Sequence, residues 1–88
     1  MNIVVTFEPR GALYVQFRDA KVARTVELVK DALLVDLDEH GNVLGIEALR
    51  SGTLSVTLGQ ISKTYHLPEE ARLINFENLD KAFVMTSV

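Results

Sequence analysis

Apolar and polar positions alternate along the first half of the chain, a pattern that indicates half-buried β-strands. Every second residue is apolar in residues 3–7 and again in residues 13–17. The segment Pro9-Arg10-Gly11 between them suits a three-residue hairpin loop with glycine in the left-handed conformation. Pairing Phe7 with Leu13 then puts both apolar sets on one face. The pattern therefore predicts a β-hairpin over residues 3–17.

Three further strands are predicted to follow in order, over residues 22–29, 32–38 and 43–49. Asp19-Ala20 and Lys30-Asp31 would form two of the turns, although Lys30-Asp31 lacks the glycine that such turns prefer. Arg24 does not fit the apolar face of its strand, which places it near a sheet edge or beside a bulge. Pairing residue 28 with 33 and residue 37 with 44 turns one apolar set inward. Its members are Val22, Val26, Leu28, Leu33, Val35, Leu37, Leu44, Ile46 and Ala48.

The second half of the chain is predicted to be mainly helical. Leu54, Leu58, Ile61 and Tyr65 have helical spacing, yet residues 53–58 also alternate like a strand and contain β-branched residues, which are poor helix formers. We favour a helix because the apolar stripe extends through Tyr65, too far for a short strand.

Beyond this helix, Pro68-Glu69-Glu70 fits the first turn of a second, short helix. Residues 74–81 are predicted to be irregular, and residues 82–85 to form an edge strand or a dimer arm. The expected fold class is α+β, as a single domain over residues 1–88. An antiparallel β-meander of four to five strands (residues 1–50) precedes a helical part (residues 51–88), with a C-terminal helix packed on one face.

Composition limits the classes of function. Hydrophobic residues make up 48% of the 88 residues, which is high for so small a chain and predicts a homo-oligomer, in the first place a twofold dimer. The net charge of −3 argues against nucleic-acid binding, which needs a basic surface. The apolar runs are shorter than the roughly 20 residues of a membrane span. The chain has no cysteine and its first residues do not resemble a signal peptide, so we expect a cytoplasmic protein.

Residues 7–49 resemble a bacterial family, the domain of unknown function 2283. The resemblance rests on residues 12–14, on residues 22–27, and above all on Val35 to Glu47, where the chain follows the pattern D-x-D-x-x-G-x-V-x-G-I-E. Two positions depart from it: Gly11 replaces an acid, and no glycine is present at Lys30-Asp31. The resemblance implies a small fold of sheet and helix. Because members often occur beside small toxin-like proteins, it also implies an antitoxin-like binding role by analogy.

The outward face of the predicted sheet is the candidate functional surface. The predicted pairing places Thr25, Asp36 and Gly45 in one row, and Glu27, Leu34 and Glu47 in the next. Tyr14 and Arg18 extend this face from the second strand. Clustered carboxylates can act as an acid/base pair, form a recognition surface, or simply be the polar side of an antiparallel sheet. The residues of interest are Tyr14, Thr25, Glu27, Asp36 and Glu47.

Two other motifs match the sequence only in part. Residues 36–47 place Asp36, Asp38 and Glu47 at positions 1, 3 and 12 of a calcium-binding loop, but strands rather than helices are predicted on both sides, and a motif needs its structural context. Residues 58–70 resemble the first helix and turn of a helix-turn-helix, but the next segment begins with two glutamates, which disfavours DNA. No metal, cofactor or nucleic acid is therefore expected.

The sequence favours a small non-catalytic module that self-associates and binds a partner protein. One alternative is a small enzyme that uses the carboxylates of the outward face. A metal-binding domain is a third possibility.

Overall fold

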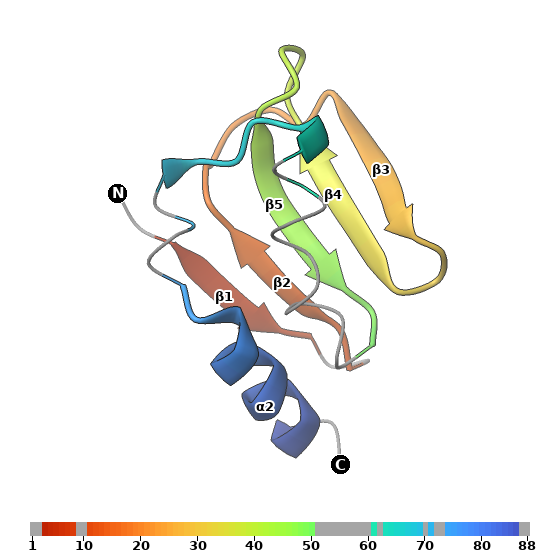
Figure 1. Cartoon of the computed structure of the whole chain (residues 1–88), viewed down its shortest axis with the longest axis vertical. Coiled ribbons are helices and arrows are strands. Elements are labelled where there is room, and N and C mark those ends of the chain that lie inside the picture. Colours follow the sequence, from red (N-terminus) through yellow and green to blue (C-terminus); the bar gives the residue numbers. More distant parts are fainter. Residues whose placement is uncertain are drawn as a thin grey trace.

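The structure is a computed structural model, which describes residues 3–8, 11–50, 61, 63–69, 71 and 74–86. Within these residues, the elements labelled in Figure 1 are strands β1 to β5 and helix α2. In chain order they are β1 (Val4–Phe7), β2 (Leu13–Gln16), β3 (Arg24–Val29), β4 (Leu33–Leu37), β5 (Val43–Ala48) and α2 (Phe76–Thr86). No helix among the described residues is both long and apolar enough to cross a membrane.

The five strands form one antiparallel sheet in the order β1-β2-β5-β4-β3. The predicted α+β class is confirmed, but the predicted meander is wrong, because β5 and not β3 lies beside β2. Residues 17–23 instead carry the chain across the end of the sheet (Figure 1). Strands β2 to β5 thus have the connectivity of a Greek key. Asp19-Ala20 is therefore not a hairpin turn.

The turn predictions can be compared with the backbone at two places. Phe7 pairs with Leu13, and Gly11 has a φ of +87°, as predicted for the first hairpin. Asp31 takes the left-handed conformation, with a φ of 57°, in the turn between β3 and β4. Aspartate tolerates this region better than most side chains, which explains how the turn forms without a glycine.

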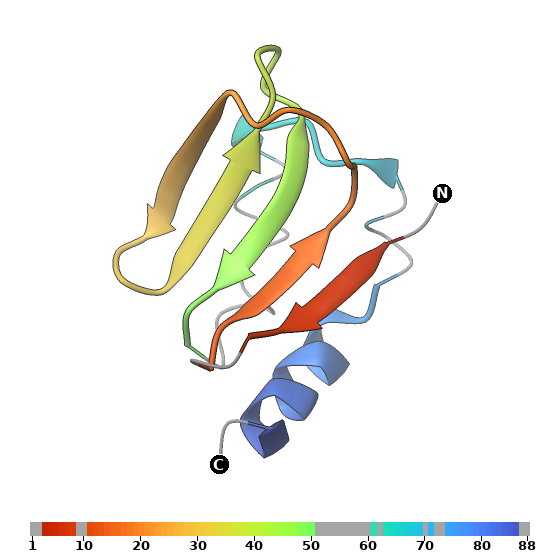
Figure 2. The same ribbon diagram turned by 180° about the vertical axis from the view of Figure 1, so that it is seen from behind.

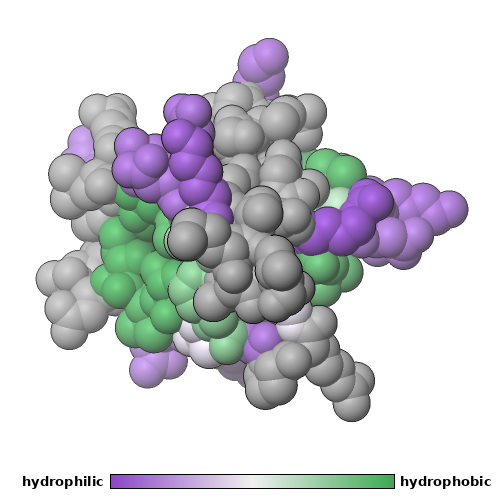
Figure 3. Space-filling view, turned by 90° about the horizontal axis from the view of Figure 1, so that it is seen from below, coloured by the Kyte–Doolittle hydropathy of each residue, from purple (hydrophilic) through white to green (hydrophobic). Residues whose placement is uncertain are grey.

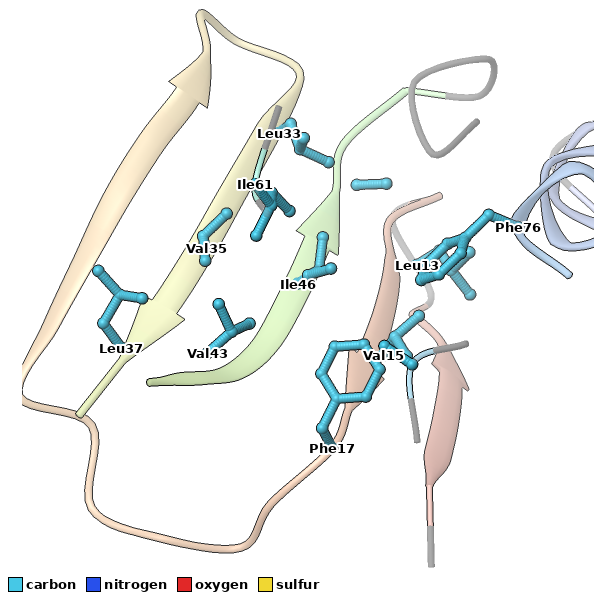
Figure 4. Close-up of a cluster of buried hydrophobic side chains, with 12 residues drawn as sticks. Leu13, Val15, Phe17, Leu33, Val35, Leu37, Val43, Ile46, Ile61 and Phe76 are labelled. Carbon is cyan, nitrogen blue, oxygen red and sulfur yellow. The ribbon is translucent and has the colours of Figure 1, made fainter. Parts of the chain in front are cut away.

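The core lies on one face of the sheet (Figure 4). The predicted inward residues of β2 and β4 are completely buried, and so are Ile46 and Ala48 of β5. Val26 and Leu28 pack against this core while remaining partly exposed. Val22 is 43% exposed, so its predicted inward position is wrong. It precedes β3, in the connection that leaves the core.

Two register shifts account for the remaining errors in the predicted pairing. Leu33 pairs with Val29 instead of Leu28, after a shift in β3. Leu37 pairs with Val43 instead of Leu44, after a shift beside Asp36. Val43 therefore occupies the core position predicted for Leu44. A bulge of this kind adds one residue to one strand, and alternation alone cannot locate it.

The part of the chain after β5 completes the core. Ile61 is fully buried and lies with Val35 and Ile46 in the core layer (Figure 4). His66 holds this part against the β4–β5 turn: its amide donates to the Gly41 carbonyl, and its carbonyl accepts from the Val43 amide. Most of the predicted helix that contains Leu54 to Tyr65, including the ambiguous residues 53–58, lies outside the described residues. The described residues Ile61, Lys63 and Thr64 are helical.

Helix α2 contradicts the predictions for residues 74–81 and 82–85, because Phe76–Thr86 is continuous α-helix. It begins at Asn75, whose side-chain oxygen accepts from the Asn78 amide at 3.0 Å, as an N-cap residue does. Phe76 is buried beside the core and Leu79 packs against it. The helix lies at the end of the sheet near β1 (Figures 1 and 2).

Candidate functional site

The face of the sheet opposite the core is open. Seen from behind, no described segment lies over the middle of its strands (Figure 2). Because directly paired residues of antiparallel strands point to the same face, the pairing defines two complete rows across it. One row holds Val4, Gln16, Gly45, Asp36 and Thr25, and the next holds Thr6, Tyr14, Glu47, Leu34 and Glu27. Both predicted rows are confirmed, with residues of β1 and β2 added to each.

Tyr14, Thr25 and Asp36 form a hydrogen-bonded cluster on this face. The Tyr14 hydroxyl donates to Oδ2 of Asp36 at 2.7 Å, and the Thr25 hydroxyl donates to Oδ1 at 2.6 Å. Both oxygens of the carboxylate on β4 are thus engaged by side chains from strands on its two sides, the adjacent β3 and the more distant β2. The cluster holds the carboxylate in one orientation.

Gly45 makes the contact between Tyr14 and Asp36 possible. These two residues lie in different rows and on strands separated by β5, so the Tyr14 ring crosses β5 at Gly45. A Cβ atom on Gly45 would overlap the Tyr14 hydroxyl and lie 2.6 Å from its Cζ. The sequence placed Gly45 in the correct row, but nothing in the alternation indicated that it supports an aromatic ring.

The surroundings raise the pKa of two groups on this face. Burial raises the pKa of Tyr14 well above its ordinary value, and the hydrogen bond to Asp36 and the charges of Asp36 and Glu47 add to this. Burial also raises the pKa of Glu47, together with the charge of Glu8, a hydrogen bond with Glu8 and the charge of Asp36. Glu8 was not among the residues predicted for this face, although extending the predicted β1–β2 pairing by one residue places it there.

The other predicted residues take different places. Glu27 lies at the β3 end of its row, next to Leu34. Arg18 follows β2, and its amide donates to the Leu44 carbonyl. The Arg18 side chain lines a shallow depression of about 340 Å³ with Asp38 and Pro68. Neither of the two depressions described in the structure is lined by Glu27, Asp36 or Glu47.

The segment that fits the calcium-loop spacing is organised as a turn. Asp38 accepts from the amides of His40 and Asn42, both at 2.9 Å, and from the Asn42 side chain. These bonds lower the pKa of Asp38, the one from the Asn42 side chain most. Asp36 is engaged instead by Tyr14 and Thr25 on the outer face. Among the described residues, no group of three or more histidine or acidic side chains is close enough to hold a metal ion.

Fold and site together define a small α+β protein whose antiparallel sheet is covered on one face and presents an ordered acidic surface on the other. Residues 11–51 match the model of a protein family described as "Protein of unknown function (DUF2283)". This match confirms the resemblance predicted from the sequence and covers β2 to β5, including Tyr14, Asp36 and Gly45. No curated protein and no solved structure matches the chain.

Proposed function

We propose that this protein is a non-catalytic interaction module, which self-associates and binds a basic surface of a partner protein through the open face of its sheet. The observation that carries the proposal is the charge of that face. Its two complete rows contain three carboxylates, Glu27, Asp36 and Glu47, and neither lysine nor arginine. A face of one sign attracts a partner of the opposite sign and excludes others.

The order of the face supports binding. The Asp36 carboxylate is held by hydroxyls at 2.6 and 2.7 Å, and the Tyr14 ring lies against β5. A surface whose side chains are fixed before binding loses less conformational entropy in the complex. Half-buried Leu34 lies between Glu27 and Glu47 and adds apolar area, and tyrosine is enriched in protein interfaces.

The test uses the partner itself. The tagged chain is purified from its natural host, a protein that co-purifies at fixed stoichiometry is identified, and its affinity for the isolated chain is measured at several salt concentrations. We expect the double variant Glu27→Gln/Glu47→Gln to bind about tenfold more weakly, because each exposed ion pair contributes up to about 1 kcal/mol. Its affinity should also depend less on salt.

The matched control is Asp19→Asn/Glu39→Gln, which removes the same charge from exposed positions outside the two rows. It should bind like the unmodified chain. Equal weakening by both double variants would show that net charge and not the open face is responsible. A chain that co-purifies with no stoichiometric protein would contradict the proposal.

The raised pKa of Glu47 beside Glu8 favours a second candidate, a small enzyme that uses this pair as a general acid and base. Turnover of simple esters, amides or glycosides by the unmodified chain, lost in Glu47→Gln, would support this alternative. Failure to turn over any of them would remove it.

The absence of cysteine supports our proposal that the protein acts in the reducing cytoplasm.

A further inference from the structure

The two edges of the sheet differ in how well they are protected against pairing with another strand. The edge strand β3 carries Arg24 and Glu27 and contains a register shift. Charges and bulges on an edge strand prevent such pairing. The other edge strand, β1, has the sequence Val-Val-Thr-Phe, and all four side chains are exposed. It therefore has neither charge nor proline, and its pairing with β2 runs in register throughout.

Apolar side chains on β1 are exposed to an unusual extent. Val4, Val5 and Phe7 are 47, 37 and 42% exposed, and they are three of the five large apolar side chains exposed among the described residues. Apolar side chains also gather at the surface on the lower end of the molecule, the end where α2 lies (Figure 3). An uncharged, exposed edge strand such as β1 is a template for pairing with another strand.

We infer that β1 is the seam at which two copies of the chain pair as antiparallel strands about a twofold axis at Val5, so that their sheets become continuous. The inference rests on the self-association in the proposed function and assigns its location and register.

The backbone of β1 is oriented for such pairing. The Glu8 amide donates to the Ala12 carbonyl at 2.7 Å and so points toward β2. Backbone groups of successive strand residues point to opposite edges, so those of Ile3, Val5 and Phe7 point to the free edge. No described strand pairs with them.

Side-chain parity restricts the register. Val5 lies opposite Val15 of the core, so Ile3, Val5 and Phe7 belong to the core face, whereas Val4 and Thr6 belong to the outer face. In a continuous sheet, paired residues must share a face. A twofold axis must therefore pass through a residue and not between two residues.

Two registers place the axis near the middle of β1, one at Val5 and one at Thr6. The register centred on Val5 pairs the two copies better. It pairs Val5 with Val5, and Ile3 with Phe7 of the second copy, so that every outward backbone group of these residues is bonded and the apolar layer continues across the seam. A register centred on Thr6 would place Val4 against Glu8.

A second copy suits this edge better than another partner because the edge is uncharged and complements itself. Its partner must offer a neutral apolar strand, and β1 itself is one. The seam involves about five residues from each copy, fewer than the 20–30 per side of a standard interface. We therefore expect a dimer that dissociates on dilution.

The register is tested with single cysteines, since the chain contains none. In Val5→Cys the two Cα atoms would be about 5.5 Å apart, within the range of a disulfide. In Val4→Cys and Thr6→Cys they would be diagonal neighbours at roughly 7–8 Å, beyond that range. Under mild oxidation we expect a covalent dimer from Val5→Cys and monomers from Val4→Cys, Thr6→Cys and the exposed control Val22→Cys. A covalent dimer from Thr6→Cys instead, or equal dimer from all four, would overturn the register.

The seam is tested by sedimentation equilibrium over a concentration series. Val5→Lys places a charge on the axis and should raise the dimer dissociation constant at least tenfold, whereas Val22→Lys should leave it unchanged. Circular dichroism shows whether each variant folds. If Val5→Lys does not fold, the dimer dissociation constant is measured for reduced Val5→Cys instead. An unmodified chain that stays monomeric at millimolar concentration would overturn the inference. Partner binding by the open face would remain measurable in Val5→Lys, so the failure of one proposal is distinguishable from that of the other.

Discussion

At the scale of single residues, the open face depends on a position that has no side chain. Gly45 lies between Gln16 and Asp36 in its row, and the Tyr14 ring occupies the space above it. We predict that Gly45→Ala destabilises the protein by about 1–3 kcal/mol, the usual cost of overpacking. Urea unfolding measures this loss.

A double-mutant cycle identifies the cause of that loss. In a Tyr14→Ala background the added methyl group no longer meets the ring, so Gly45→Ala should cost less there, although the Val15 carbonyl still lies 3.0 Å from the new Cβ. Contacting residues typically couple by 0.5–3 kcal/mol in such cycles. Additive effects of the two substitutions would show that the Tyr14 ring does not lie over Gly45.

A second prediction at this scale concerns the Tyr14 hydroxyl in alkaline solution. Its folded-state pKa is raised above the ordinary value of 10.0. Below pH 10 both the folded and the unfolded chain keep this proton, so the contribution to stability is complete. As the pH rises further, the unfolded chain ionises first and the folded state loses stability.

We therefore expect the free energy of unfolding to fall more steeply above pH 10 for the unmodified chain than for Tyr14→Phe. The two chains differ in this hydroxyl alone, so Tyr14→Phe is a matched control. In Tyr65→Phe, Tyr14 is the single tyrosine left of two, and ultraviolet absorbance should show that it ionises only when the protein unfolds. Ionisation in the folded protein near pH 10 would contradict the hydrogen bond to Asp36.

At the scale of elements, alternation predicted which way side chains point but not which strands are neighbours. The row of Thr25, Asp36 and Gly45 was predicted correctly because opposite residues of β3, β4 and β5 follow from two hairpins. The position of β5 beside β2 could not be predicted, since it depends on a connection, residues 17–23, that is equally compatible with a hairpin. The Tyr14–Asp36 bond depends on that strand order, so the candidate residues were identified without the contact that joins two of them.

Helix α2 shows a different limit of prediction from the sequence. Phe76 and Leu79 have helical spacing, and asparagine at position 75 is a favourable N-cap, yet the segment is short and was predicted to be irregular. The burial of Phe76 in the core supplies what local propensity lacks, because most helical stability in proteins comes from packing.

The cap of α2 leads to a prediction for this element. Asn75→Ala removes the acceptor of the Asn78 amide and should destabilise the protein by about 1 kcal/mol. The same bond is formed by the Asn78 backbone, so Asn78→Ala keeps it and should stay within about 0.5 kcal/mol of the unmodified chain. Urea unfolding compares the two, and hydrogen exchange of the backbone amide at position 78 should accelerate only in Asn75→Ala. Equal stability of the two variants would show that the cap contributes nothing.

At the scale of the whole molecule, the core extends beyond the segment that matches the family. Residues 11–51 contain four strands, whereas β1 covers the edge of β2, and the core contains Ile61, Ala71 and Phe76 from the C-terminal part. The His66 backbone also bonds to the β4–β5 turn. The hydrogen-bonded cluster of Tyr14, Thr25 and Asp36 on the open face therefore lies within the matched segment, but the layer beneath it needs the rest of the chain.

This division predicts that a fragment of residues 11–51 does not fold alone. Without Ile61, Ala71 and Phe76, the apolar side chains of Val15, Val35 and Ile46 would face water, and chains of about 40 residues seldom fold without disulfides, metals or partners. We expect the fragment to lack a cooperative melting transition by circular dichroism, while the full chain melts cooperatively. Within the full chain, Ile61→Ala should cost about 2–5 kcal/mol, because Ile61 is completely buried. A fragment that melts cooperatively, or an Ile61→Ala variant as stable as the unmodified chain, would show that the core of the sheet is complete without the C-terminal part.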